Sequence, residues 1–172
     1  MPEEDGTDRC RCCDAARETQ VHLHRCSVLW PIWKTFRNLI KECWKSVKPC
    51  HELTFFGMTE QGEFLPLGLR GFHAIMWKMI IIEFSRVGMN DGTVFNTKTI
   101  LPFTISRLQT RMNTLYFTHR RRWGNARRRG KPPPSTTKIN NLLSPLASVA
   151  EDKITWSAGW LSLCASYKVE IT

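Results

Sequence analysis

The stretch CRCCDAARETQVHLHRC, residues 10–26, is followed directly by SVLWPIWKTFRNLIKECWKSVK, residues 27–48. The first part is rich in cysteine and histidine and contains too few large apolar residues to build a core of its own. The second part repeats apolar residues every three or four positions, the spacing of one buried helix face. Together they predict a small Cys/His-rich module that precedes an amphipathic, tryptophan-containing helix.

Four side chains in the first part have the types and the spacing of a metal site. Cys10 and Cys13 form a C-x2-C pair, and His22 and Cys26 form an H-x3-C pair. Four nitrogen and sulfur ligands are the set that a closed, structural zinc site uses. We therefore predict one structural Zn²⁺ ion in a CCHC knuckle, whose binding supplies the folding free energy of the segment.

Neighbouring residues leave alternatives open for two of these ligands. Cys12 can take the place of Cys13, but only one residue then separates it from Cys10. His24 can take the place of His22, which leaves only one residue before Cys26. A further alternative is that these thiols are unrelated groups in a disordered segment.

The rest of the chain predicts a mainly α-helical fold with about three helices. After residues 27–48, an apolar run at 71–87 is long enough for a buried helix, although its segment 79–82 alone resembles a strand. A third helix starts near Thr99 and ends before the glycine and prolines at 130–134. Three such helices can enclose one core.

The domain organisation follows from these patterns. We predict a flexible leader at 1–9, the zinc knuckle with its Trp-rich helix at 10–48, and the remaining helical body at 49–131. Residues 132–172 begin with the linker composition PPPSTTKINN. Their later part favours neither helix nor strand, so we predict a Pro-rich linker and a poorly defined tail whose structure the sequence leaves open.

The positive charge is concentrated in one segment. The chain has 25 Lys and Arg against 15 Asp and Glu, and residues 101–131 hold nine of these cations and no acid. Such a block is typical of a surface that binds phosphate groups. We predict that it binds RNA or DNA through Arg107, Arg111, Arg120, Arg121, Arg122, Trp123, Arg127, Arg128, Arg129 and Lys131.

Other interpretations of this segment remain. Trp123 lies between two arginine clusters, where it either stacks on an unpaired base or closes the apolar face of its helix. The arginine block itself also fits a nuclear-import signal, a contact with acidic protein, or a solvated segment without a partner.

Several classes of protein are excluded. No apolar run reaches the roughly 18 residues of a membrane span, and the acidic start MPEEDGTDRC has no apolar signal core. We expect a nuclear or cytoplasmic chain that is not secreted, with no membrane partner and no small-molecule substrate. A deaminase is disfavoured because the sequence has neither H-x-E nor P-C-x-x-C.

The order of residues around the predicted knuckle resembles a known family. It reads C-x2-C at 10–13, E-T-x-x-H-L at 18–23, Cys26, and then Trp30 and Trp33. This order is similar to the zinc-binding domain at the C-terminal end of reverse transcriptases from non-LTR (LINE-type) retrotransposons. The resemblance is specific over 10–48, weaker to about residue 129, and absent after Pro132.

The resemblance implies a binding role and no catalysis. By this resemblance, Cys10, Cys13, His22 and Cys26 are the zinc ligands. The nucleic acid that the domain binds is element RNA or target DNA. A reverse transcriptase needs an adjacent aspartate pair, and none of the five aspartates here has an aspartate neighbour. We expect a fragment or remnant without polymerase activity, able to contact a polymerase domain. The alternative is a structural, protein-interaction zinc module with a basic docking or import segment.

Overall fold

A computed structural model describes residues 9–89 and 92–171. The leader predicted at 1–9 lies outside the described residues except for Arg9. Within them the chain is mainly helical, as predicted, with seven helices and one two-stranded antiparallel sheet. None of these helices combines the length and the apolar composition that a membrane crossing requires.

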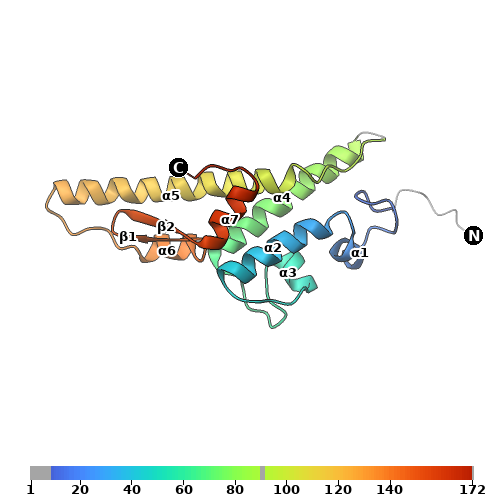
Figure 1. The fold of residues 1–172 in the computed structure, drawn as a ribbon, viewed down its shortest axis with the longest axis horizontal. Coiled ribbons are helices and arrows are strands. Elements are labelled where there is room, and N and C mark those ends of the chain that lie inside the picture. Colours follow the sequence, from blue (N-terminus) through green and yellow to red (C-terminus); the bar gives the residue numbers. More distant parts are fainter. Residues whose placement is uncertain (1–8, 90–91, 172) are drawn as a thin grey trace, which may run out of the picture.

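The three helices that the sequence predicts form the long framework of the molecule. They are α2 (Trp30–Cys43), α4 (Leu67–Met89) and α5 (Ile100–Arg128). Pro31 lies in the first turn of α2, where its missing N–H costs nothing. In Figure 1, α4 and α5 run antiparallel and side by side, and α5 extends beyond α4 at one end.

The remaining elements are shorter, and they were not among the three helices that the sequence predicts. They are α1 (Gln20–Arg25), α3 (His51–Phe56), α6 (Thr137–Leu143), β1 (Ala147–Ala150), β2 (Lys153–Trp156) and α7 (Ala158–Ser166). The two strands form a hairpin in which Ala147 pairs with Trp156 and Ala150 with Lys153. Figure 1 places this hairpin and α6 beneath the far half of α5.

Aromatic side chains join α2 to α4 in the core. Phe36 and Phe72 are both buried and stack with ring centroids 5.6 Å apart. Trp33 lies 5.3 Å from Trp77 in a tilted arrangement. Such aromatic pairs stabilise a core beyond the area they bury, so the helix that follows the Cys/His segment is fixed against the body.

The C-terminal residues complete this core. Trp160 of α7 is fully buried and meets Phe72 edge to face at 6.4 Å. Its indole N–H donates to the side-chain oxygen of Gln109 on α5, at 2.6 Å. A side chain at Gly159 would lie 2.7 Å from the sulfur of Cys43, so α7 packs directly on α2. The segment for which the sequence favoured neither helix nor strand therefore contributes to the centre of the fold.

Candidate metal centre and candidate nucleic-acid interface

A tight loop presents the first two cysteines. The Cys10 N–H donates to the Ala16 carbonyl and the Asp14 N–H donates to the Cys10 carbonyl, each at 2.8 Å. Asp14 adopts a left-handed conformation with φ of 55°, which Asp tolerates better than most residues. The chain therefore reverses between Cys10 and Ala16, and Cys13 returns toward Cys10.

Helix α1 presents the histidine. The Thr19 hydroxyl accepts a hydrogen bond from the His22 backbone N–H at 3.1 Å, which caps the helix. The helix ends at Arg25, and the Trp30 N–H donates to the Cys26 carbonyl at 2.8 Å. Cys26 therefore lies between α1 and α2, and its backbone is fixed by the start of α2.

Cys10, Cys13, His22 and Cys26 converge. Their ligand atoms all lie within 4.8 Å of one another. The two sulfurs of Cys10 and Cys26 are 4.0 Å apart, and the Cys13 sulfur is 3.2 Å from His22 Nε2. A tetrahedral zinc site has ligand–ligand edges of about 3.4–3.8 Å. The group can hold a metal ion with ligand shifts of about 1 Å or less.

Burial and backbone amides act on the thiols in opposite directions. Burial raises the pKa of the Cys26 thiol to about 11. At Cys13 burial also acts to raise the pKa, but hydrogen bonds from the Ala15 amide, the Cys10 and Cys26 thiols and the Ala16 amide together outweigh it, and the pKa lies below its usual value. Backbone N–H groups directed at a sulfur favour its thiolate form, which is the form that binds a metal.

The structure separates the four converging residues from the two alternative ligands. Cys12 is not part of the group, although it neighbours Cys13. His24 is buried on the other side of α1, where its Nδ1 lies 2.8 Å from the Thr54 hydroxyl. All seven cysteines are free thiols.

Arg11, which the sequence analysis did not single out, ties the loop to the body. Its backbone N–H donates to a Glu18 carboxylate oxygen at 2.9 Å and its Nε donates to the other at 3.1 Å. The hydrogen bond from the Arg11 side chain lowers the pKa of Glu18. The Arg11 guanidinium also lies 4.8 Å from the ring centroid of Phe84 on α4. The only signal of the Arg11–Glu18 contact in the sequence was the acid Glu18, eight residues after Cys10.

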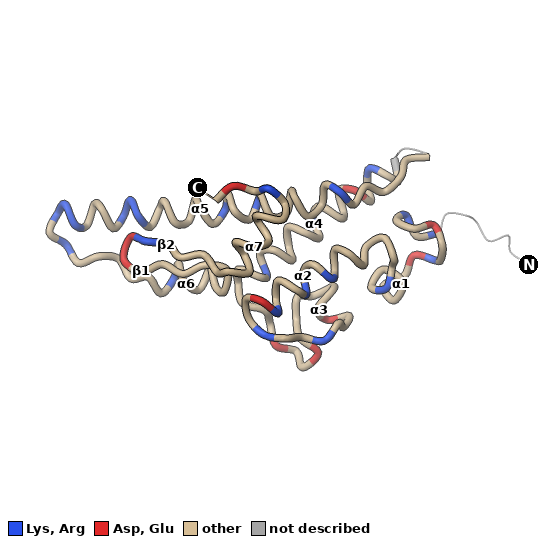
Figure 2. Tube along the Cα trace, viewed as in Figure 1, with Lys and Arg blue, Asp and Glu red and all other residues tan. Residues whose placement is uncertain are grey.

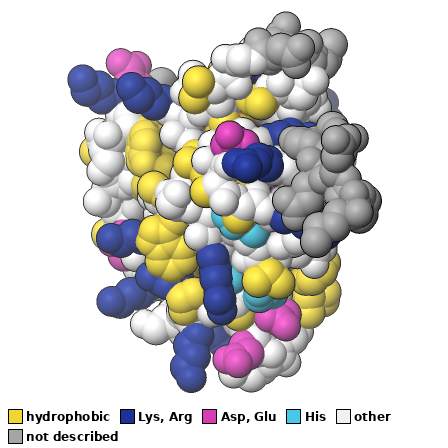
Figure 3. Space-filling view, turned by 90° about the vertical axis from the view of Figure 1, so that its right-hand side faces the viewer, with side chains coloured by type: hydrophobic (Ala, Val, Ile, Leu, Met, Phe, Trp, Pro, Cys, Tyr) yellow, Lys and Arg dark blue, Asp and Glu magenta, His cyan; other side chains and the backbone are white. Residues whose placement is uncertain are grey.

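A second anchor joins α1 to α2. The Trp33 indole N–H donates to the Leu23 carbonyl at 3.0 Å. The candidate metal centre therefore contacts both α2 and α4. Figure 3 looks onto this end of the molecule, where basic, acidic and histidine side chains lie among apolar ones.

The predicted nucleic-acid-binding cations lie along α5 and just beyond it. Arg107, Arg111, Arg120–Arg122, Arg127–Arg129 and Lys131 are all exposed. In the part of the chain that the structure describes, none of them lies within ion-pair distance of an acid. In Figure 2, acidic residues lie on the β1–β2 turn beside the far half of α5, and an acidic residue of the C-terminal segment lies beside its near half. Two backbone carbonyls of the β1–β2 turn accept hydrogen bonds from α5. The Glu151 carbonyl accepts from His119, and the Asp152 carbonyl accepts from the Tyr116 hydroxyl.

The cations occupy more than one side of the helix. At about 100° per residue, Arg107, Arg111, Arg122 and Arg129 share one face, and this line is about 33 Å long at 1.5 Å per residue. Arg120 and Arg127 lie on nearly the opposite face. We call residues 120–131 the arginine end, because cations surround the helix there.

Around the axis of α5, Trp123 lies on the same side as the buried residues of the helix. It is half-buried, and the Arg127 guanidinium lies 5.6 Å from its ring centroid. One face of the ring is therefore covered by a cation of the same helix.

The metal centre and the arginine end lie at opposite ends of the long axis. Figure 1 shows α1 at one end and the C-terminal part of α5 at the other, with the core helices between them. Figure 2 shows Lys and Arg along the free end of α5. The two predicted sites do not form one surface.

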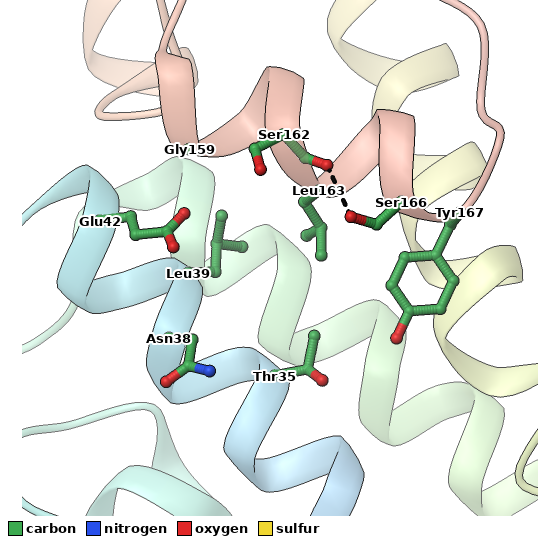
Figure 4. Close-up of a pocket in the computed structure, with 9 residues that line it drawn as sticks. All are labelled: Thr35, Asn38, Leu39, Glu42, Gly159, Ser162, Leu163, Ser166 and Tyr167. Carbon is green, nitrogen blue, oxygen red and sulfur yellow. Dashed lines mark hydrogen bonds between the residues drawn. The ribbon is translucent and has the colours of Figure 1, made fainter.

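The hollows of the described part of the chain include two that lie between pairs of helices. One, of about 260 Å³, lies between α2 and α7 and is lined by polar side chains, with Glu42 as its charged residue (Figure 4). The other, of about 320 Å³, lies between α5 and α6 beside the arginine end. Comparison with protein-family models, with curated protein sequences and with solved structures gave no match to this chain.

Proposed function

We propose that this chain is a zinc-stabilised module that binds nucleic acid through the arginine end. The observation that carries the proposal is the set of exposed cations on α5 and after it, with no acidic ion-pair partner among the described residues. Uncompensated cations at this density attract a polyanion, and phosphate contacts provide affinity without sequence preference.

The shape of the arginine end supports a nucleic-acid ligand. Cations lie on several sides of α5, and Arg121 and Arg128 repeat at seven residues, about 10.5 Å along the axis. A helix with this distribution can contact phosphates of both strands when it lies in a groove. A single acidic peptide would use only one of these sides.

The zinc ion is the second part of the proposal. Cys10, Cys13, His22 and Cys26 provide three sulfurs and one nitrogen, the set typical of structural zinc. A site with four protein ligands leaves no position for a substrate, so we assign the ion a structural role. The resemblance of residues 10–48 to the reverse transcriptase zinc-binding domain supports both this role and RNA or DNA as the ligand.

The salt dependence of binding to a 20-base-pair duplex tests the function. Seven phosphate contacts predict a slope of about −6 for log affinity against log salt. Replacing Arg127, Arg128 and Arg129 with glutamine should reduce this slope by about 3. The matched control replaces Lys34, Lys41 and Lys48, three exposed cations elsewhere, and should change the slope by less than about 1.

Two outcomes would contradict this function. A wild-type slope near zero would show that phosphate contacts do not drive binding. Equal losses in the two triple variants would show that only net charge matters and that the arginine end is not the binding site. Binding of an acidic protein in place of the duplex would favour the alternative function, a protein-interaction module.

A further inference from the structure

The hollow between α5 and α6 lies on the face of α5 that carries the line of cations. Arg122 belongs both to that line and to the lining of the hollow. Thr118, one turn before Arg122, lines it as well. A nucleic-acid strand that follows the line of cations therefore passes over the opening of this hollow.

The inner surface of the hollow is apolar. Leu115 of α5 and Ile139 and Leu142 of α6 form it. Ile139 is buried and the other two are half-buried. His119 forms one wall, and its Nε2–H donates to the Glu151 carbonyl at 2.8 Å, which holds the ring in place. Such a surface accepts the flat, apolar face of a base.

The outer edge of the hollow is basic and hydroxyl-bearing. Arg122 and Lys138 are exposed cations on either side of it, from α5 and α6 respectively. None of the residues that line the hollow is acidic. An apolar interior between two cations matches a nucleotide, which joins an apolar ring to an anionic phosphate.

The volume limits what can enter. About 320 Å³ lies at the lower end of the range of small-molecule sites. It has room for about one nucleotide, whereas a base pair with its two sugars and two phosphates is twice as large. The hollow between α2 and α7 has a similar size but carries Glu42 and no cation, so it does not suit a phosphate (Figure 4).

We propose that the hollow between α5 and α6 binds one unpaired nucleotide of a strand that lies along the arginine end. The proposal rests on the proposed nucleic-acid binding and makes it specific: the preferred ligand has an unpaired segment beside a duplex. Arg122 and Lys138 hold the phosphate, and the base lies against Leu115, Ile139 and Leu142.

The experiment compares three labelled probes at one salt concentration. They are a blunt 20-base-pair DNA duplex, the same duplex with a four-nucleotide unpaired DNA end, and the same duplex with an RNA end. The wild-type chain should bind an unpaired end at least about fivefold more tightly than the blunt duplex. The RNA and DNA ends show whether a 2′-hydroxyl contributes.

Thr118→Trp fills the hollow without removing a cation. This variant should lose the preference for the unpaired end and keep the affinity for the blunt duplex. The matched control, Thr110→Trp, places the same side chain at an exposed position about two turns earlier on α5, and should keep the preference. Because Thr118 is half-buried, Lys138→Gln provides a second test at an exposed position, with Lys153→Gln as its control.

The outcomes separate the two proposals. Equal wild-type affinity for blunt and unpaired ends, or a preference that survives in both Thr118→Trp and Lys138→Gln, would overturn the nucleotide site and leave the arginine end as a duplex-binding surface. Absence of salt-dependent binding to every probe would overturn the nucleic-acid function itself.

Discussion

The end of the molecule that carries α1 differs from the arginine end in what holds its backbone in place. Residues 9–26 contain one helix of six residues and a loop closed by single hydrogen bonds. The arginine end belongs to a helix of 29 residues, in which each further turn adds backbone hydrogen bonds to a helix that is already formed. Short helices are unstable alone, whereas extension of a formed helix is favourable.

This difference matches what each site requires. A metal site needs four atoms at fixed separations, and the loop at Cys10–Cys13 and the cap at Thr19 provide fixed backbone positions. Phosphate binding needs positive charge held at the surface, and a helix that extends beyond the body provides that without a core. The two ends are therefore expected to respond differently to the same treatments.

Removal of the proposed zinc ion should give the largest effect. Structural zinc contributes about 10–16 kcal/mol to small modules of this kind. With a chelator, backbone amides of residues 10–26 should lose hydrogen-exchange protection, while amides of α5 near Arg120 keep theirs. Duplex affinity should stay within about twofold, because the two ends do not touch.

Variants identify the ligands in the same experiment. Cys13→Ser should remove the bound zinc in metal analysis, whereas Cys12→Ser, at a neighbouring thiol outside the converging group, should retain it. Zinc that remains bound in Cys13→Ser would contradict the assignment. A large loss of duplex affinity on chelation would show that the ends are coupled.

The periodic parts of the fold follow from the sequence. The apolar stripe that begins at Leu29 and the pattern that begins near Thr99 predict α2 and α5, because a helix face recurs every three or four residues. The spacing of Cys10, Cys13, His22 and Cys26 predicts their convergence, because short loops limit how far apart ligands can lie.

The C-terminal packing does not follow from local patterns. Trp160 is buried because Phe72 and Gln109, at distant positions in the chain, lie beside it. α7 contains residues such as Gly159 and Ser162 that do not mark an amphipathic helix. The hollow beside Arg122 likewise depends on how α6 packs on α5, which no spacing in the sequence encodes.

The cap of α1 provides the next comparison of the two ends. Thr19→Ala removes the side-chain acceptor for the His22 N–H and should lower the free energy of unfolding by about 1 kcal/mol. Thr99 occupies the matching position before α5 but makes no side-chain cap hydrogen bond, so Thr99→Ala should cost less than about 0.5 kcal/mol. Urea denaturation of the zinc-bound protein measures both.

Equal effects at the two positions would contradict the difference between the ends. They would mean that the short helix is held by the metal ligands alone, or that α5 depends on its first turn. A loss confined to Thr19→Ala would show that the backbone cap and the ion both contribute to the position of His22.

The smallest expected effect is a gain in helix stability at the arginine end. α5 continues through Gly124, and a side chain there would meet no atom within 4 Å. Gly124→Ala should therefore stabilise the last turns by about 0.5 kcal/mol, because alanine loses less backbone entropy than glycine in a helix. Slower amide exchange at residues 124–129 measures this gain.

Gly130 is the matched control for that gain. A side chain there also meets no atom within 4 Å, but the residue has φ of +60°. Gly130→Ala should destabilise the end of α5 by about 1 kcal/mol, because the left-handed conformation is unfavourable for alanine. Opposite signs at two glycines with equally open surroundings would show that backbone conformation, and not packing, sets the stability of the arginine end. Equal signs would contradict this explanation.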